Sequence, residues 1–167
     1  FIRPFVQTNK TDAADARAIW TVVQQPEMRT VAAKTEDQQA MLSLHRMRAL
    51  LVKFRTMQVN QLRGLLYEFG ATFRAGRAAG LAEIRARTAE LEDALPGTMM
   101  CCLQDQLRRI EELQRDIDLL EKRIGVWQKQ DAACHAITAV PGIGRLTATA
   151  LVATMGDAKS FRSGREF

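Results

Sequence analysis

The sequence predicts a mainly α-helical fold whose largest part is a long antiparallel helical hairpin. Apolar residues recur every three or four positions through residues 36–69 and again through residues 99–129. Proline and glycine gather between these two stretches and after them, where helices end. Each stretch would form a helix about 50 Å long, at 1.5 Å per residue. Because the two lengths are similar, we expect the helices to pack against each other as the arms of the hairpin.

The first arm, residues 36–69, carries one apolar stripe that we expect to face the second arm. The stripe consists of Leu44, Met47, Leu51, Phe54, Gln58, Leu62, Leu65 and Phe69. Two consecutive steps of four residues, on either side of Gln58, form a stutter that would locally unwind a supercoil. Three glycines then loosen the chain, and a shorter helix is predicted over residues 81–93.

The second arm, residues 99–129, has a more regular stripe. Its members are Leu103, Leu107, Ile110, Leu113, Ile117, Leu120, Ile124 and Trp127. Acids precede bases by four positions, which is typical of a solvent-exposed helix surface. These pairs are Asp105 with Arg109, Glu111 with Arg115, and Asp118 with Lys122. Since a helix pair has a thin core, we expect a second chain to add another pair and form a homodimer or higher homo-oligomer. The alternative is that the arms pack only within the chain.

A helix is predicted to begin after Thr11, a suitable N-cap, and to end before Pro26. Asp12 and Asp15 lie three residues apart, so both carboxylates project from one face of its first turn. One interpretation is that these acids complement the helix dipole. The other is that they form half of a Mg²⁺ site for phosphoryl transfer, with the remaining ligands from elsewhere. Residues 1–7, apolar and broken by a proline, suit an edge strand or an extended lead-in.

A tight Pro-Gly-Ile-Gly turn at residues 141–144 is predicted to join a short helix over 131–140 to another over about 146–155. Its glycines let the backbone approach a ligand, and the first N–H groups of the second helix lack helical partners. Such a helix start binds phosphate, and the pattern resembles the helix-hairpin-helix motif of proteins that hold DNA by its backbone. The candidate contacts are Gly142, Gly144, Arg145, Thr147 and Thr149. The alternative is a turn that only links two packed helices.

The formal net charge is +5, and most of the positive excess lies in the first arm and just beyond it. Between residues 46 and 77 the only acid is Glu68, against seven basic residues. The basic residues are Arg46, Arg48, Lys53, Arg55, Arg63, Arg74 and Arg77. A basic stretch of this kind suits nucleic acid, and the first four residues are the candidate DNA contacts. The alternative is a solvated basic helix face.

The cysteines and histidines do not form a metal-binding pattern. They are Cys101, Cys102, Cys134, His45 and His135. The odd number of cysteines and the lack of a C-x-x-C pair speak against a zinc site or a disulfide framework, and we expect small buried thiols in a reducing bacterial cytoplasm. Neither a membrane-length apolar run nor a signal pattern is found. Because the sequence starts without Met, we expect a piece of a longer protein.

The order of these elements, and several stretches within them, resemble a known family. The stretches are N-K-T-D-A-A-D-A at residues 9–16, V-P-G-I-G-R-L-T-A-T-A-L-V-A-T-M-G-D at 140–157, F-R-S-G-R-E-F at 161–167, and residues 38–46 and 60–70. The family is that of bacterial insertion-sequence transposases with a RuvC-like DEDD catalytic domain, which is associated with bridge-RNA-guided recombination. The likeness covers nearly the whole chain.

The resemblance implies that Asp12 and Asp15 are the third and fourth acids of the DEDD set, which binds Mg²⁺ in the RuvC-like domain. The first Asp and the Glu of that set would precede the start of this sequence. The serine thought to attack the DNA backbone would follow its end, so no nucleophile is expected in this segment. Ser160 and Ser163 do not match the motif of that serine, and helix capping explains them better.

The resemblance also implies a division into three parts. Residues 1–35 would end a RuvC-like α/β domain, residues 36–130 would form a coiled-coil arm with its tip at about 70–97, and residues 131–167 would begin a transposase domain with the helix-hairpin-helix. The implied function is Mg²⁺-dependent cutting and rejoining of insertion-sequence DNA, with DNA and a guide RNA as partners, although this segment alone would be inactive. Two alternatives stay open: a non-catalytic helix-hairpin-helix module that binds DNA and dimerises, and a structural coiled-coil protein.

Overall fold

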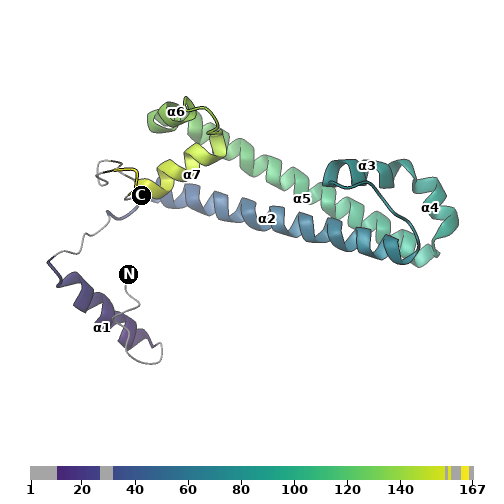
Figure 1. Cartoon of the computed structure of the whole chain (residues 1–167), viewed down its shortest axis with the longest axis horizontal. Coiled ribbons are helices and arrows are strands. Elements are labelled where there is room, and N and C mark those ends of the chain that lie inside the picture. Colours follow the sequence, from purple (N-terminus) through teal and green to yellow (C-terminus); the bar gives the residue numbers. More distant parts are fainter. Residues whose placement is uncertain (1–10, 27–31, 157, 159–162, 166–167) are drawn as a thin grey trace. The chain divides into compact units, whose positions relative to one another are not determined.

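The computed structural model describes residues 11–26, 32–156, 158 and 163–165, and within them the chain is helical, with no strand (Figure 1). The helices are α1 (Asp12–Val23), α2 (Glu36–Glu68), α3 (Arg77–Ala86), α4 (Thr88–Ala94), α5 (Gly97–Gln130), α6 (Ala132–Thr138) and α7 (Arg145–Met155). The mainly α-helical prediction is therefore confirmed for this part of the chain. The lead-in predicted at residues 1–7, and Ser160, lie outside it.

The chain divides into two compact units, residues 1–34 with 157–167, and residues 35–156. The first unit contains α1, which begins where the sequence predicted. The Thr11 hydroxyl accepts a hydrogen bond from the N–H of Ala14 at 3.2 Å and so caps the helix. The helix ends at Val23, ahead of Pro26. Whether α1 completes a RuvC-like α/β domain stays a prediction.

Helices α2 and α5 run side by side in opposite directions as the two arms of the hairpin (Figure 1). α2 starts with a capping box, in which Thr35 and Gln38 each accept a hydrogen bond from the other's backbone N–H. The stripe predicted on α5 is confirmed, because its residues at heptad spacing are buried. They are Leu103, Ile110, Ile117 and Ile124.

The stripe predicted on α2 is partly wrong. Met47 is 54% exposed, Phe54 is 43% exposed, and Phe69 is also exposed. The residues that α2 buries are Met41, Val59, Leu62 and Leu66. Between Met41 and Val59, the half-buried Arg48 and Arg55 reach across to α5. α2 has apolar residues on two faces, and long arginine stems fill part of the inner one, so spacing alone selected the wrong set.

At the tip of the hairpin, the single helix predicted over residues 81–93 is two helices, α3 and α4, which meet at Arg87. The Arg87 guanidinium donates to the carbonyl of Thr72 at 3.0 Å, pairs with Glu90 at 2.7 Å, and lies 5.0 Å from the ring centroid of Phe73. These contacts tie the break to the preceding loop. The tip encloses the larger apolar cluster, which includes Leu66, Leu81, Ile84, Leu91 and Leu103.

The expectation of buried thiols is wrong for the two cysteines near the tip. Cys101 and Cys102 are exposed, whereas Cys134 on α6 is buried as expected. The α5 stripe runs through Met100 and Leu103, so the two intervening thiols point to the outer sides of the helix.

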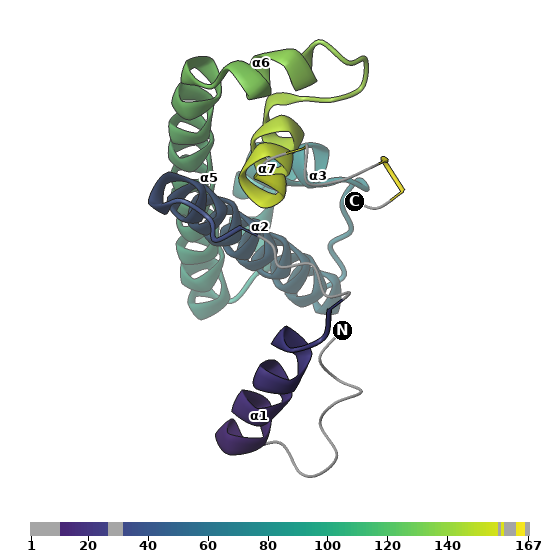
Figure 2. The same cartoon turned by 90° about the vertical axis from the view of Figure 1, so that its left-hand side faces the viewer.

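At the opposite end of the arms, α7 packs on α2 and α5, beside α6 (Figure 2). A second apolar cluster forms there around Met41, Ile124 and Ala153, with Trp127 and Leu146 packed against it. Helices α6 and α7 therefore belong to the same compact unit as the arms. Among the helices of residues 11–26 and 32–156, none has the length and apolar character needed to cross a membrane.

Candidate functional site

The acidic pair on α1 lies as the spacing predicted. Asp12 and Asp15 both occupy the first turn, Asp12 exposed and Asp15 half-buried. Among the described residues, no third His, Cys, Asp or Glu joins them in a group suited to hold a metal ion. The pair is thus compatible with both a helix-terminus role and a partial metal site, and the choice between these roles stays a prediction.

The predicted turn between α6 and α7 forms an exposed, uncapped helix start. Gly142 has φ +89°, a conformation that side chains disfavour, and this lets the chain reverse between the helices. Gly144 is the N-cap of α7 and has extended backbone with no side-chain cap. The first N–H groups of α7 are therefore without a capping side chain. Thr147 is exposed in the first turn of the same helix.

Arg145, the first residue of α7, is partly engaged within the protein. Its guanidinium lies 3.6 Å from the carboxylate of Glu121 on α5, and its side chain stays 56% exposed. The same carboxylate pairs with Arg48 of α2 at 2.7 Å. Glu121 thus links guanidinium groups from two other helices, and the Arg145 guanidinium is held near α5 while its side chain stays open to solvent.

Thr149 is not a phosphate contact, contrary to the sequence analysis. Its side chain is fully buried, and its hydroxyl lies 3.0 Å from Nε2 of His45 on α2 while donating to the carbonyl of Arg145 at 2.9 Å. Burial and the nearby Arg48 lower the pKa of His45. Residues two apart on a helix point in different directions, so Thr147 and Thr149 were never equivalent candidates. Thr149 instead docks α7 on α2.

The basic residues of the first arm divide into two groups. Arg46 and Lys53 are exposed and make no ion pair within the described part of the chain. Arg48 and Arg55 are half-buried, and each donates to a side chain of α5, Arg48 to Glu121 and Arg55 to Gln114. The number of charges along the chain does not reveal this division. As candidate nucleic-acid contacts, the exposed pair are free, whereas the inner pair already bridge the two arms.

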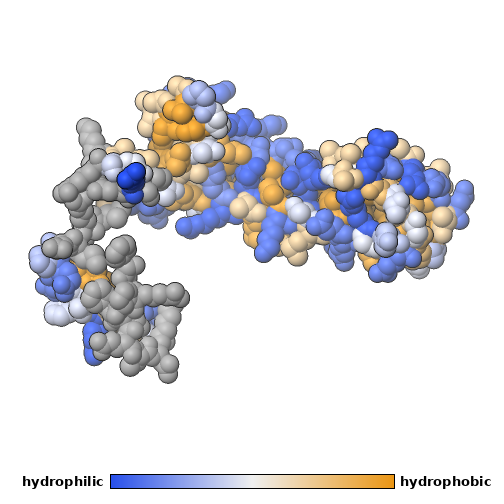
Figure 3. Space-filling model, in the orientation of Figure 1, coloured by the Kyte–Doolittle hydropathy of each residue, from blue (hydrophilic) through white to orange (hydrophobic). Residues whose placement is uncertain are grey.

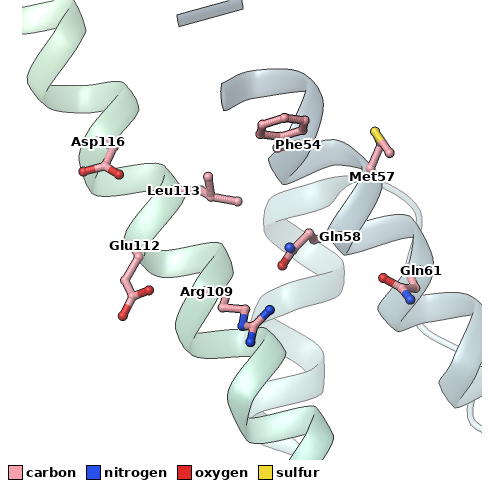
Figure 4. Close-up of a pocket in the computed structure, with 8 residues that line it drawn as sticks. All are labelled: Phe54, Met57, Gln58, Gln61, Arg109, Glu112, Leu113 and Asp116. Carbon is pink, nitrogen blue, oxygen red and sulfur yellow. The ribbon is translucent and has the colours of Figure 1, made fainter. Parts of the chain in front are cut away.

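A groove of about 540 Å³ lies between α2 and α5 (Figure 4). Gln58 points toward α5, Leu113 points toward α2, and Arg109 lies beside them. The side-chain oxygen of Gln58 is buried without a hydrogen-bond partner in the structure. Phe54 and Met57 form the α2 side of the groove. The groove therefore joins apolar surface to an unsatisfied polar atom.

The α2 side of this groove continues as an exposed apolar stripe. It consists of Met47, Leu50, Phe54 and Met57, at steps of three, four and three residues. This is the spacing of a coiled-coil seam, although the four side chains are 43–55% exposed. Figure 3 shows hydrophobic surface interspersed with hydrophilic surface along the α2–α5 pair. Met47 and Phe54 of this stripe were predicted from the sequence to lie on the inner face.

Comparison with known proteins gives concordant matches. Residues 3–70 match a family model described as transposase, of the DEDD group of IS110 elements, and residues 134–167 match one described as transposase of the IS116/IS110/IS902 family. A probable family 20 transposase of Pseudomonas aeruginosa is 40% identical over 168 residues, which is 100% of this chain and 50% of that protein.

Two further relatives come from other bacteria. The transposase for insertion sequence element IS1328 of Yersinia enterocolitica is 36% identical, over 100% of this chain and 49% of its own length. The transposase for insertion sequence element IS1111A of Coxiella burnetii is 33% identical, over 99% of this chain and 45% of its own length. The chain thus spans about half the length of the curated relatives it matches. No solved structure matches it.

Proposed function

This chain belongs to the IS116/IS110/IS902 family of transposases, and from that premise we propose that it is part of an enzyme that cuts and rejoins the DNA strands of an insertion sequence. The observation that carries the proposal is the pair of family matches, one of which includes both acids of α1. Because the chain spans about half of its relatives, the catalytic activity belongs to the whole protein. The segment alone is not expected to cut DNA.

Asp12 and Asp15 are the residues proposed to hold Mg²⁺. Two carboxylates on one turn supply hard oxygen ligands, which this ion prefers, and α1 carries no His or Cys that would favour a softer metal. When bound, Mg²⁺ neutralises charge that develops at a scissile phosphate. The contribution of this chain is to hold two ligands at a fixed spacing on a capped helix.

The turn before α7 and the exposed basic side chains of α2 are proposed to hold the nucleic-acid backbone. Uncapped N–H groups at Gly144 and the helix dipole favour a phosphate, and Arg145 and Thr147 lie beside them. We propose that this turn works as a helix-hairpin-helix and that Arg46 and Lys53 add non-specific phosphate contacts. DNA is the proposed partner, together with the guide RNA that the resemblance implies.

The exposed stripe of α2, residues 47–57, is proposed to pair with a second copy of the chain. Its coiled-coil spacing fits a partner helix, and burying it would remove four large apolar side chains from water. Sedimentation of Phe54→Glu/Met57→Glu should show a monomer if this is the interface. Leu119→Glu on α5 is the matched control, because Leu119 is equally exposed but lies outside the stripe. An unchanged oligomer in the stripe variant would refute the assignment.

The catalytic proposal is tested in the intact gene product, by strand cleavage with Mg²⁺ and by DNA binding. Asp12→Ala/Asp15→Ala should abolish cleavage while binding persists. The control is Glu36→Ala/Asp37→Ala, which removes the two first-turn acids of α2 and leaves α1 intact. If the Asp12/Asp15 variant cuts DNA normally, the acids serve only the helix terminus, and the segment reduces to a DNA-binding and dimerising module.

A further inference from the structure

A second groove, of about 470 Å³, lies near the tip of the arms between α3 and α5. Arg77 and Arg85 of α3 face Gln114 and Arg115 of α5 across it, and Ile110 forms part of its floor. The residues come from segments about thirty residues apart, so the charge pattern of the sequence did not reveal the groove. It combines guanidinium groups from two helices in one concave surface.

The groove carries an unbalanced positive charge. Arg85 pairs with Glu111 at 2.7 Å, which neutralises one guanidinium. Arg77 and Arg115 are exposed and have no carboxylate partner among the described residues. Three arginines against one glutamate leave the lining with two positive charges, and Asp118, which is not a lining residue, accepts a hydrogen bond from the Gln114 amide at 2.8 Å.

The inner end of the groove brings two guanidinium groups onto one neutral atom. Arg55 of α2 and Arg77 of α3 both donate to the side-chain oxygen of Gln114, Arg77 at 3.0 Å. The Nε of Arg55 is buried and has no hydrogen-bond partner. Burial and the repulsion of Arg77 and Arg48 lower the pKa of Arg55, and the carboxylates of Asp118 and Glu121 oppose this shift only in part. An amide oxygen is a weak acceptor for two cations, and an anion at this point would relieve the repulsion.

We propose that the α3–α5 groove binds the phosphodiester backbone of a nucleic acid, with Arg77 and Arg115 as the phosphate contacts and Arg55 and Gln114 positioning Arg77. The inference rests on the proposed function and adds to it a site on the arm, apart from the turn before α7. Guanidinium forks match phosphate oxygens in geometry and charge. An acidic peptide would present the same charge, but the family match favours a nucleic acid.

The test is a salt series of binding titrations with the full chain, run separately with duplex DNA and with single-stranded RNA. Arg77→Gln/Arg115→Gln should lower the slope of log affinity against log salt by about 1.8 on DNA, since each phosphate contact contributes about 0.9. Arg108→Gln/Arg123→Gln is the matched control, because it removes the same charge from exposed positions of α5 outside the groove. Equal losses of slope in the two variants would overturn the site. The nucleic acid for which the groove variant shows the larger loss of slope is identified as the ligand. Competition by a glutamate polymer as strong as that by nucleic acid would also overturn it.

Gln114→Glu provides a second, independent variant. It places a carboxylate where Arg55 and Arg77 already converge and removes the hydrogen bond from the Gln114 amide to Asp118. It should therefore weaken nucleic-acid binding while keeping a cooperative thermal transition, which a misfolded variant would lack. Unchanged affinity in Gln114→Glu would refute the proposal. If wild type binds and every groove variant binds equally well, only this inference fails. If wild type binds no nucleic acid, the proposed function fails with it.

Discussion

Breaking the ion pair between Arg48 and Glu121 should measurably destabilise the unit of residues 35–156. The two side chains meet at 2.7 Å and are 28% and 23% exposed, so water screens them only partly. At an effective dielectric constant near 20, the Coulomb attraction at this distance is about 6 kcal/mol before desolvation and side-chain entropy are subtracted. Exposed pairs contribute about 0.2–1 kcal/mol, and breaking buried ones costs about 3–5 kcal/mol. We therefore expect Glu121→Gln to cost about 1–3 kcal/mol.

The assay is a double-mutant cycle of Arg48→Gln and Glu121→Gln, followed by thermal and urea unfolding. A loss of 1 kcal/mol corresponds to about 3–6 °C in the midpoint for a unit of this size. The pair should show a coupling free energy of about 1–2 kcal/mol. The matched control is Asp105 with Arg108, which meet at 2.8 Å but are 57% and 67% exposed, and should couple by less than about 0.5 kcal/mol. Equal coupling in the two cycles would refute the argument that partial burial strengthens the pair.

Two further predictions concern titratable groups. The pKa of His45 is lowered in the fold, so below about pH 6.5 the unfolded state binds more protons than the folded state. The free energy of unfolding should therefore decrease as the pH is lowered through this range. His45→Gln should lose this part of the pH dependence in urea titrations, and an identical profile would contradict the assignment. A thiol reagent at about pH 8 should modify exposed Cys101 and Cys102 quickly and Cys134 only on unfolding, because burial raises the pKa of Cys134 to about 11. Three equally fast thiols would show that α6 opens readily.

The sequence predicted the second arm well because one face of α5 carries nearly all of its large aliphatic residues. Ile110 and Ile117 stand at heptad spacing with no competing stripe of equal length. α2 differs, since Phe54 belongs to an outer stripe while Val59 belongs to the inner one. Local spacing finds both stripes but does not say which of them faces α5. That choice depends on residues far away in the sequence.

The candidate site, too, could be predicted only where it depends on residues close together in the sequence. The Asp12 and Asp15 pair and the turn before α7 depend on neighbouring residues, and sequence reasoning located both. The role of Thr149 depends on His45, which lies 104 positions away, and no local pattern encodes that contact. The convergence of arginines on Gln114 likewise joins three helices. Long-range pairing of polar side chains was therefore the part of the site that the sequence concealed.

The two polar bridges between the arms also determine the axial register of the hairpin. Arg48 and Arg55 lie seven residues apart, and so do their partners Glu121 and Gln114. A slip of one heptad, about 10 Å, would keep aliphatic side chains facing aliphatic ones along most of the seam. In one direction, however, it would set Gln114 against Leu62, and in the other it would set Glu121 against Met41. An apolar seam alone would tolerate several alignments, whereas these polar partners favour one, and so they fix which residues of α2 lie against each turn of α5.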